Sequence, residues 1–104
     1  MEGADVGDDW IQQLHEWWDR HAYYPQEALL NREDGTLQIH LVIRRDGHVT
    51  EVDKLSSSGS RSIDIAGESV FRNAALQPFP NSTPQPQADI YLTLQYILIR
   101  HGAN

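Results

Sequence analysis

Cysteine is absent from the 104-residue sequence, and basic residues are few. Without cysteine the chain has no disulfides, no thiolate nucleophile and no thiolate metal ligands, although this leaves its compartment open. Lysine and arginine number 8 against 15 aspartate and glutamate residues, which gives a net charge of −7. Because binding to phosphates needs a cluster of cationic side chains, nucleic acids and anionic membranes are poor partners for this protein.

Long apolar runs are also missing. No stretch approaches the roughly 20 apolar residues of a transmembrane helix. The acidic start MEGADVGDD is not typical of a secretory leader or a transit peptide. At 104 residues, of which 39% are hydrophobic, the chain is sized for one domain with one core. We therefore expect a single domain over residues 9–104, preceded over residues 1–8 by an acidic disordered tail or a cloning remnant.

Three segments have the apolar spacing of helices. Residues 9–21 carry an apolar stripe at spacings of three and four and predict an amphipathic helix. The three tryptophans of this stripe favour docking on a sheet over an aromatic ligand cage. Pro25 fits the first position of a short second helix that Gly35 stops. A third helix is expected over residues 62–76, with serines at its start and Pro78 at its end.

The remaining segments predict strands. Apolar and polar residues alternate over residues 36–45, which indicates a half-buried strand, and Asp46-Gly47 is a strong hairpin turn. The return strand over residues 48–55 breaks period two, so we expect a bulge or an edge position. After a proline-rich connector, residues 88–100 predict a long last strand. The predicted fold class is α+β, a three-stranded antiparallel sheet with helices packed on one face. Its core should include Trp17, Leu41, Val70 and Leu94.

Signatures of catalysis or metal binding are weak. The five histidines are scattered, and the six-residue spacing of His15 and His21 does not place two imidazoles on one helical face, so no metal site is expected. The serines of the SSSGSRS segment could form a nucleophile loop with a histidine and Asp64. Helix capping explains the same serines without a catalytic role. We therefore expect no catalytic residues and no cofactor.

The last strand is unusual because its outward face carries no acid. Between residues 90 and 100 the only charge is Arg100. If this strand lies at a sheet edge, it lacks the lysine, proline or bulge that usually protects an edge, and it becomes a binding site for another strand. The alternative is a well-covered central strand. The outward residues are Tyr91, Thr93, Gln95, Ile97 and Ile99.

Several short markers occur in order between residues 23 and 100. They are Tyr24-Pro25 with Ala28, Gly35 before the first strand, Asp46-Gly47 followed by Val49 and Val52, Ser57-Ser58-Gly59, and Ile63-Asp64-x-Ala66. Each marker is weak alone, but their joint occurrence is specific. The combined pattern resembles the C-terminal domain of TonB-family energy transducers. The tryptophan-rich helix lies before the shared pattern.

The resemblance implies a periplasmic domain of an inner-membrane-anchored protein whose N-terminal part engages the proton-driven motor proteins ExbB and ExbD. The domain would bind the TonB box, a short extended segment of outer-membrane TonB-dependent receptors, by strand addition beside its last strand. It would thereby support uptake of siderophores, haem or similar nutrients, with no small-molecule substrate of its own. The expected partner-binding residues are Tyr23, Tyr24, Pro25, Tyr91, Thr93, Gln95, Ile97 and Ile99.

Other functions stay open at this point. One is a related envelope adapter, either a TolA-like domain or a dedicated haem-uptake homologue of TonB. The other is a small serine hydrolase that uses the serine loop. The receptor served and the formation of a homodimer by strand exchange are also open. Ester turnover that is lost on Ser58→Ala would favour the hydrolase, whereas backbone pairing with a receptor peptide would favour the adapter.

Overall fold

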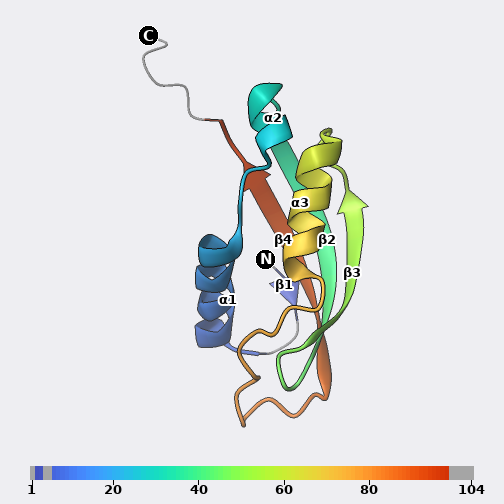
Figure 1. Ribbon diagram of the computed structural model, residues 1–104. Helices are drawn as coiled ribbons and strands as arrows, with labels where there is room; N and C mark the ends of the chain where they lie inside the picture. The colour runs from blue at the N-terminus through green and yellow to red at the C-terminus, as the bar shows by residue number, and fades with distance from the viewer. Residues whose placement is uncertain (1, 4–5, 99–104) are drawn as a thin grey trace.

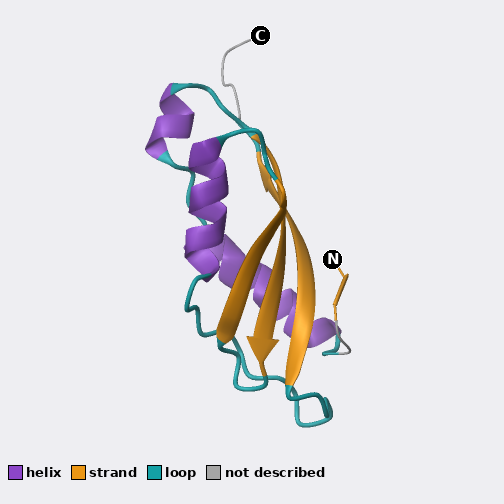
Figure 2. Cartoon of the chain, turned by 90° about the vertical axis from the view of Figure 1, so that its right-hand side faces the viewer, coloured by secondary structure: helices purple, strands orange, loops and turns teal. Residues whose placement is uncertain are grey.

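The structure is a computed structural model, and it describes residues 2–3 and 6–98. Its elements are β1 (Glu2–Gly3), α1 (Asp8–His21), α2 (Gln26–Leu30), β2 (Gly35–Arg44), β3 (Val49–Ser56), α3 (Arg61–Phe71) and β4 (Gln87–Tyr96). The strands form one antiparallel sheet in the order β1-β4-β2-β3, with the helices on one face (Figures 1 and 2). Three long antiparallel strands under helices confirm the predicted α+β class. None of the described helices combines the length and apolar character that crossing a bilayer requires.

The core lies between the helices and the inner face of the sheet. Alternation places every second side chain of a strand on the same face, so the apolar residues of β2 point together toward the helices. The predicted inner face is confirmed, because Leu37, Ile39, Leu41 and Ile43 are all 0% exposed. The matching residues of β4 are also buried, namely Ala88, Ile90, Leu92, Leu94 and Tyr96.

The hairpin between β2 and β3 is closed by the predicted Asp46-Gly47 turn. Gly47 has φ of +93°, and a Cβ there would lie 2.2 Å from the carbonyl oxygen of Leu76, so no other residue fits without a shift of the backbone. The carboxylate of Asp46 accepts a hydrogen bond from the His48 amide at 3.0 Å. Pairing of β3 with β2 shifts register at two places, which confirms the irregularity expected for this strand.

Helix α1 packs Trp10 into the core, whereas Trp17, predicted as a core residue, and Trp18 are half-buried and pack against it. Trp10 is 2% exposed, its Nε1 donates a hydrogen bond to the carbonyl oxygen of Gln77 at 2.7 Å, and its ring meets Phe79 edge-on. Trp17 and Trp18 both stack on Phe71 of α3, with ring centroids 5.3 and 5.4 Å apart. The tryptophan stripe therefore joins α1 to α3 and to the proline-rich connector, as expected for core packing rather than a ligand cage.

Helix α3 is shorter than predicted. Ser60 caps its start, accepting a hydrogen bond from the Ile63 amide at 3.3 Å. The helix ends at Phe71 rather than at residue 76, so Pro78 does not end it. Asn73 takes a positive φ of 58°, and the Leu76 amide bonds to the Gly47 carbonyl, so this segment joins the hairpin instead of continuing the helix.

One predicted core residue of α3 is only half-buried. Val70 lies at the edge of the buried face, and Phe71 fills the core in its place. The helix also approaches the sheet closely at Gly67, where a Cβ would lie 2.5 Å from a Leu37 methyl group and 3.3 Å from a Leu94 methyl group. A small residue at this point therefore allows α3 to rest directly on β2 and β4.

The two chain ends differ from the prediction. Residues 1–8 were expected as a disordered tail, but Asp8 already belongs to α1, Val6 is 1% exposed, and β1 pairs with Ile90 and Tyr91 of β4. The few apolar residues of this acidic segment carry no periodic signal, which explains why the burial of Val6 was not predicted. At the other end, β4 stops at Tyr96, and Leu98 lies beyond the strand.

Candidate functional site

The outer edge of β4 is the candidate site. On one side, all ten residues of β4 pair with β2 without a register shift. On the other side β4 pairs only with the two residues of β1, opposite Ile90 and Tyr91. Past Tyr91, no other described strand covers this edge. The sequence pattern did not decide whether this strand is an edge strand or a central strand. The structure places β4 beside the central strand β2, as an outer strand of the three long strands.

The direction of the backbone groups along this edge follows from the register. The Arg45 amide donates a hydrogen bond to the carbonyl oxygen of Pro86 at 2.8 Å, so Arg45 and Pro86 occupy a hydrogen-bonded position of the ladder, although Pro86 has no N–H to return the bond. Bonded and non-bonded pairs alternate in an antiparallel ladder, so Leu92 and Leu94 direct their amides and carbonyls toward β2. Thr93 and Gln95 consequently direct theirs away from β2, to the open edge.

The predicted outward side chains lie along this edge, on the face of the sheet opposite the helices. Tyr91 is 46% exposed, Thr93 and Gln95 are exposed, and Ile97 is 66% exposed just past the end of β4. Ile99 lies outside the described residues. A stretch without charge and with free backbone donors and acceptors can bind an extended segment by continuing the ladder.

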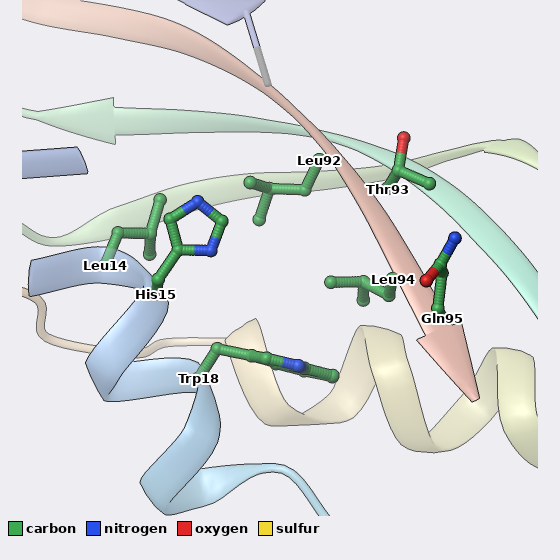
Figure 3. A pocket seen from close by; sticks show the side chains of 7 residues that line it. All are labelled: Leu14, His15, Trp18, Leu92, Thr93, Leu94 and Gln95. Carbon is green, nitrogen blue, oxygen red and sulfur yellow. The ribbon is translucent and has the colours of Figure 1, made fainter. Parts of the chain in front are cut away.

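A pocket of about 120 Å³ opens between the edge of β4 and α1. Its walls are Leu14, His15 and Trp18 from α1 and residues 92–95 from β4. Figure 3 shows Leu92 and Leu94 pointing from β4 toward α1, whereas Thr93 and Gln95 point to the other side of the strand. Leu14 and Trp18 were not predicted as site residues, because helical spacing assigns them to a buried face without saying which strand they meet. The exposed His15 was considered only as a metal ligand.

The predicted aromatic pair Tyr23 and Tyr24 lies near the C-terminal end of β4. The Tyr24 ring meets Tyr96 edge-on with centroids 5.4 Å apart, and its hydroxyl donates a hydrogen bond to the carbonyl oxygen of Glu33. Burial, followed by the charges of Asp34 and Glu33, raises the pKa of Tyr24 above its usual value. Tyr23 is 51% exposed, with its hydroxyl 3.4 Å from the Ser69 hydroxyl. Pro25 stands just before the first residue of α2 rather than at its first position, and its side chain makes no capping hydrogen bond.

A charged cluster crosses all three long strands on the open face of the sheet. His40 of β2 lies between Asp89 of β4, at 2.8 Å from Nε2, and Asp53 of β3, at 3.3 Å from Nδ1, and its ring stacks on Tyr91. The hydrogen bond to Asp89, together with that to Asp53, raises the pKa of His40 despite partial burial. The carboxylates approach opposite nitrogens and do not converge on one point. Among residues 2–3 and 6–98, no cluster is arranged to hold a metal ion.

The serine loop is organised around the carboxylate of Asp64. Ser57 and Ser58 donate their hydroxyl hydrogens to this carboxylate, at 2.5 and 2.7 Å, and Lys54 lies 3.3 Å from it. Burial alone would raise the pKa of Asp64, but the hydrogen bonds from Ser57 and Ser58 and the contact with Lys54 outweigh it and lower the pKa. The hydroxyls that the hydrolase hypothesis requires as nucleophiles are therefore engaged in closing the loop onto α3.

Comparisons with known proteins agree with one another. The family model for the C-terminal domain of Gram-negative bacterial TonB proteins matches residues 20–98. No curated protein sequence shows significant similarity. Among solved structures, a Helicobacter pylori TonB C-terminal domain has 20% identity over 92% of this chain and 87% of that chain, with a TM-score of 0.75. A second structure of that domain has 19% identity over 88% and 96% of the two chains, with a TM-score of 0.65.

A third solved structure, the HasB C-terminal domain, has 26% identity over 94% of this chain and 77% of that chain, with a TM-score of 0.60. The similar structures share the fold described above, and the family model spans most of the sequence. The chain therefore belongs to the family of Gram-negative bacterial TonB protein C-terminal domains.

Proposed function

We propose that this domain binds the TonB box of outer-membrane receptors by accepting it as an additional strand on the edge of β4. The observation that carries the proposal is the outward direction of the Thr93 and Gln95 backbone groups on an edge that has no charged side chain between Ile90 and Tyr96. Domains of this family are periplasmic and interact with outer-membrane receptors. Strand addition uses backbone hydrogen bonds, which suits an adapter that serves several receptors.

Two predicted features extend the site beyond β4. Tyr24 packs against Tyr96, and Pro25 sets the start of α2, so this segment borders the end of the strand where a bound peptide would leave the sheet. Ile97 continues the uncharged edge past Tyr96. We assign both features to the partner-binding surface together with Tyr91, Thr93 and Gln95.

The wider role follows the family. The domain would be anchored to the inner membrane by a segment outside this chain, which would engage ExbB and ExbD, and it would transmit force to receptors that import siderophores, haem or similar nutrients. The domain itself would carry no enzymatic activity and no cofactor.

An amide chemical-shift titration tests the binding proposal. The domain is titrated with a panel of synthetic peptides from the periplasmic N-terminal segments of outer-membrane receptors. Shifts concentrated on residues 90–97 are expected for at least one peptide. The proposal is wrong if the peptides leave these residues unmoved and shift another surface. A dependence of the same shifts on protein concentration without peptide would indicate instead that a second copy of the chain occupies the edge.

A further inference from the structure

We infer that the pocket between α1 and β4 holds one branched aliphatic side chain of the added strand, at the position opposite Leu94. This inference rests on the proposed strand addition and specifies the chemistry of the partner segment. Helix α1 begins at Asp8, and most of it precedes residues 20–98, which match the family model. The pocket is therefore a feature that α1 adds to the strand edge.

The register decides which residue of the partner enters the pocket. The backbone groups of Thr93 and Gln95 would hydrogen-bond to the added strand, whereas those of Leu94 bond to β2, so Leu94 would meet the added strand through its side chain alone. The partner residue opposite Leu94 would share its face and point toward α1. Figure 3 shows the Trp18 indole lying alongside Leu94 on that side. A side chain at this position would therefore enter between Leu94, Leu14 and Trp18.

The side chains that line the pocket are mostly apolar, and several of them are packed into the core. Leu14, Leu92 and Leu94 are 3%, 6% and 4% exposed, and the Trp18 ring is held by Phe71 and Tyr96. The volume of about 120 Å³ is somewhat smaller than a cavity of about 150 Å³ that holds benzene. These dimensions fit a valine, leucine or isoleucine side chain and are too small for tryptophan.

Charge at the rim favours a neutral or basic segment. Asp19 follows His15 by four residues on the exposed side of α1, and neighbours at this spacing share one face of a helix. Arg20 lines a different cavity on the other flank of α1, with Gln13 and Trp17. An acidic side chain near the anchor would therefore meet like charge, whereas a lysine or arginine would not.

The experiment uses the tightest-binding peptide of the receptor panel. Nuclear Overhauser effects to the Leu94 methyls and the Trp18 ring identify its anchor residue. Changing that anchor to alanine should weaken binding at least tenfold, because about three carbons leave an apolar site. In the domain, His15→Trp should place a larger ring at the wall of the pocket, obstruct its entrance and weaken binding of the parent peptide at least tenfold. The matched Gln13→Trp variant, on the other flank of α1, should leave affinity within twofold.

The outcomes separate the two proposals. If the peptide shifts residues 93–96 but anchor substitution and His15→Trp have no effect, the pocket inference is wrong and strand addition stands. If a bulky anchor such as tryptophan binds as well as leucine, the pocket does not select the side chain, and the inference is also wrong. If no peptide affects β4, both proposals fail together.

Discussion

The two outer long strands of the sheet differ in how their free edges are protected. β3 carries Glu51, Asp53 and Lys54, and its pairing with β2 is interrupted by two register shifts. β4 has no charged residue between Ile90 and Tyr96, and it pairs with β2 without interruption. Charges and bulges on a free edge oppose pairing with other chains. The comparison indicates that β3 is closed to strand addition and that β4 is open to it.

The difference also extends to what lies beside each edge. β3 is tied to α3 through Lys54 and Asp64, which are 3.3 Å apart, and its Leu55 is 56% exposed. β4 is bordered by α1 and by the pocket that α1 forms. The edge of β4 therefore combines free backbone groups with an uncharged stretch and an apolar recess, whereas the free edge of β3 carries charged side chains.

The largest expected effect is on the free energy of unfolding, when a leucine is replaced by alanine on each of the two strands. Leu94→Ala removes a side chain that is 4% exposed in β4, so it should lower the free energy of unfolding by about 2 to 5 kcal/mol. Leu55→Ala in β3 removes a side chain that is 56% exposed, so it should change the free energy of unfolding by less than about 0.5 kcal/mol. Urea unfolding measures both. Equal losses would mean that the inner and outer faces are assigned wrongly.

Proline substitution breaks the open edge directly. Gln95→Pro removes a backbone N–H that points away from β2. Receptor-peptide affinity should therefore fall at least tenfold, while the hydrogen bonds between β4 and β2 remain. Gln95→Ala keeps the amide and should weaken binding by only about 0.5 to 1.5 kcal/mol. Lys54→Pro, on the edge of β3, should leave peptide affinity unchanged. Calorimetric titration of the three variants checks this, and unaltered affinity in Gln95→Pro would refute the assignment of the edge.

Two tyrosines near the end of β4 should respond differently to replacement by phenylalanine. The Tyr24 hydroxyl donates a hydrogen bond to the Glu33 carbonyl, so Tyr24→Phe should cost about 1 kcal/mol of stability. The Tyr96 hydroxyl is buried without a partner, and burial raises the pKa of Tyr96 to about 12. Tyr96→Phe should therefore be neutral or slightly stabilising. Thermal unfolding distinguishes the two variants, and a larger loss for Tyr96→Phe would contradict this prediction.

The smallest effect concerns His40, which joins both outer strands. Its pKa is raised in the folded state by Asp89 and Asp53, so the stability it adds is fully present below the unfolded pKa of about 6.5. That stability is lost as the pH rises through the folded pKa. Between pH 6 and pH 8, the free energy of unfolding should fall less steeply with rising pH for His40→Gln and for Asp89→Asn than for the parent protein. Identical slopes in all three proteins would exclude this linkage.

Much of the fold could be predicted because its signals are local. The alternation in β2, the Asp46-Gly47 turn and the stripe of α1 each lie within one element, and each predicted the correct structure. The end of α3 could not be predicted, since Ala74 continues the helical spacing and Leu76 follows it before Pro78. Their burial against the hairpin depends on contacts between segments far apart in the sequence.

The candidate site was predictable only in part for the same reason. Alternation in β4 identified Tyr91, Thr93 and Gln95 as outward residues, and the missing charges suggested an edge. Which side of β4 is free depends on its pairing with β2, which no local pattern encodes. The pocket also depends on the position of α1 relative to β4. The sequence alone therefore assigns Leu14 and Trp18 to the core and not to a binding site.

Amide hydrogen exchange along β4 tests the central claim most directly. In the free monomer, Leu92 and Leu94 should exchange slowly because their amides bond to β2, whereas Thr93 and Gln95 should exchange rapidly. Addition of a binding receptor peptide should slow Thr93 and Gln95 and leave Leu92 and Leu94 little changed. Protection of Thr93 and Gln95 in the free monomer equal to that of Leu94 would contradict the account, because the edge would then already be paired.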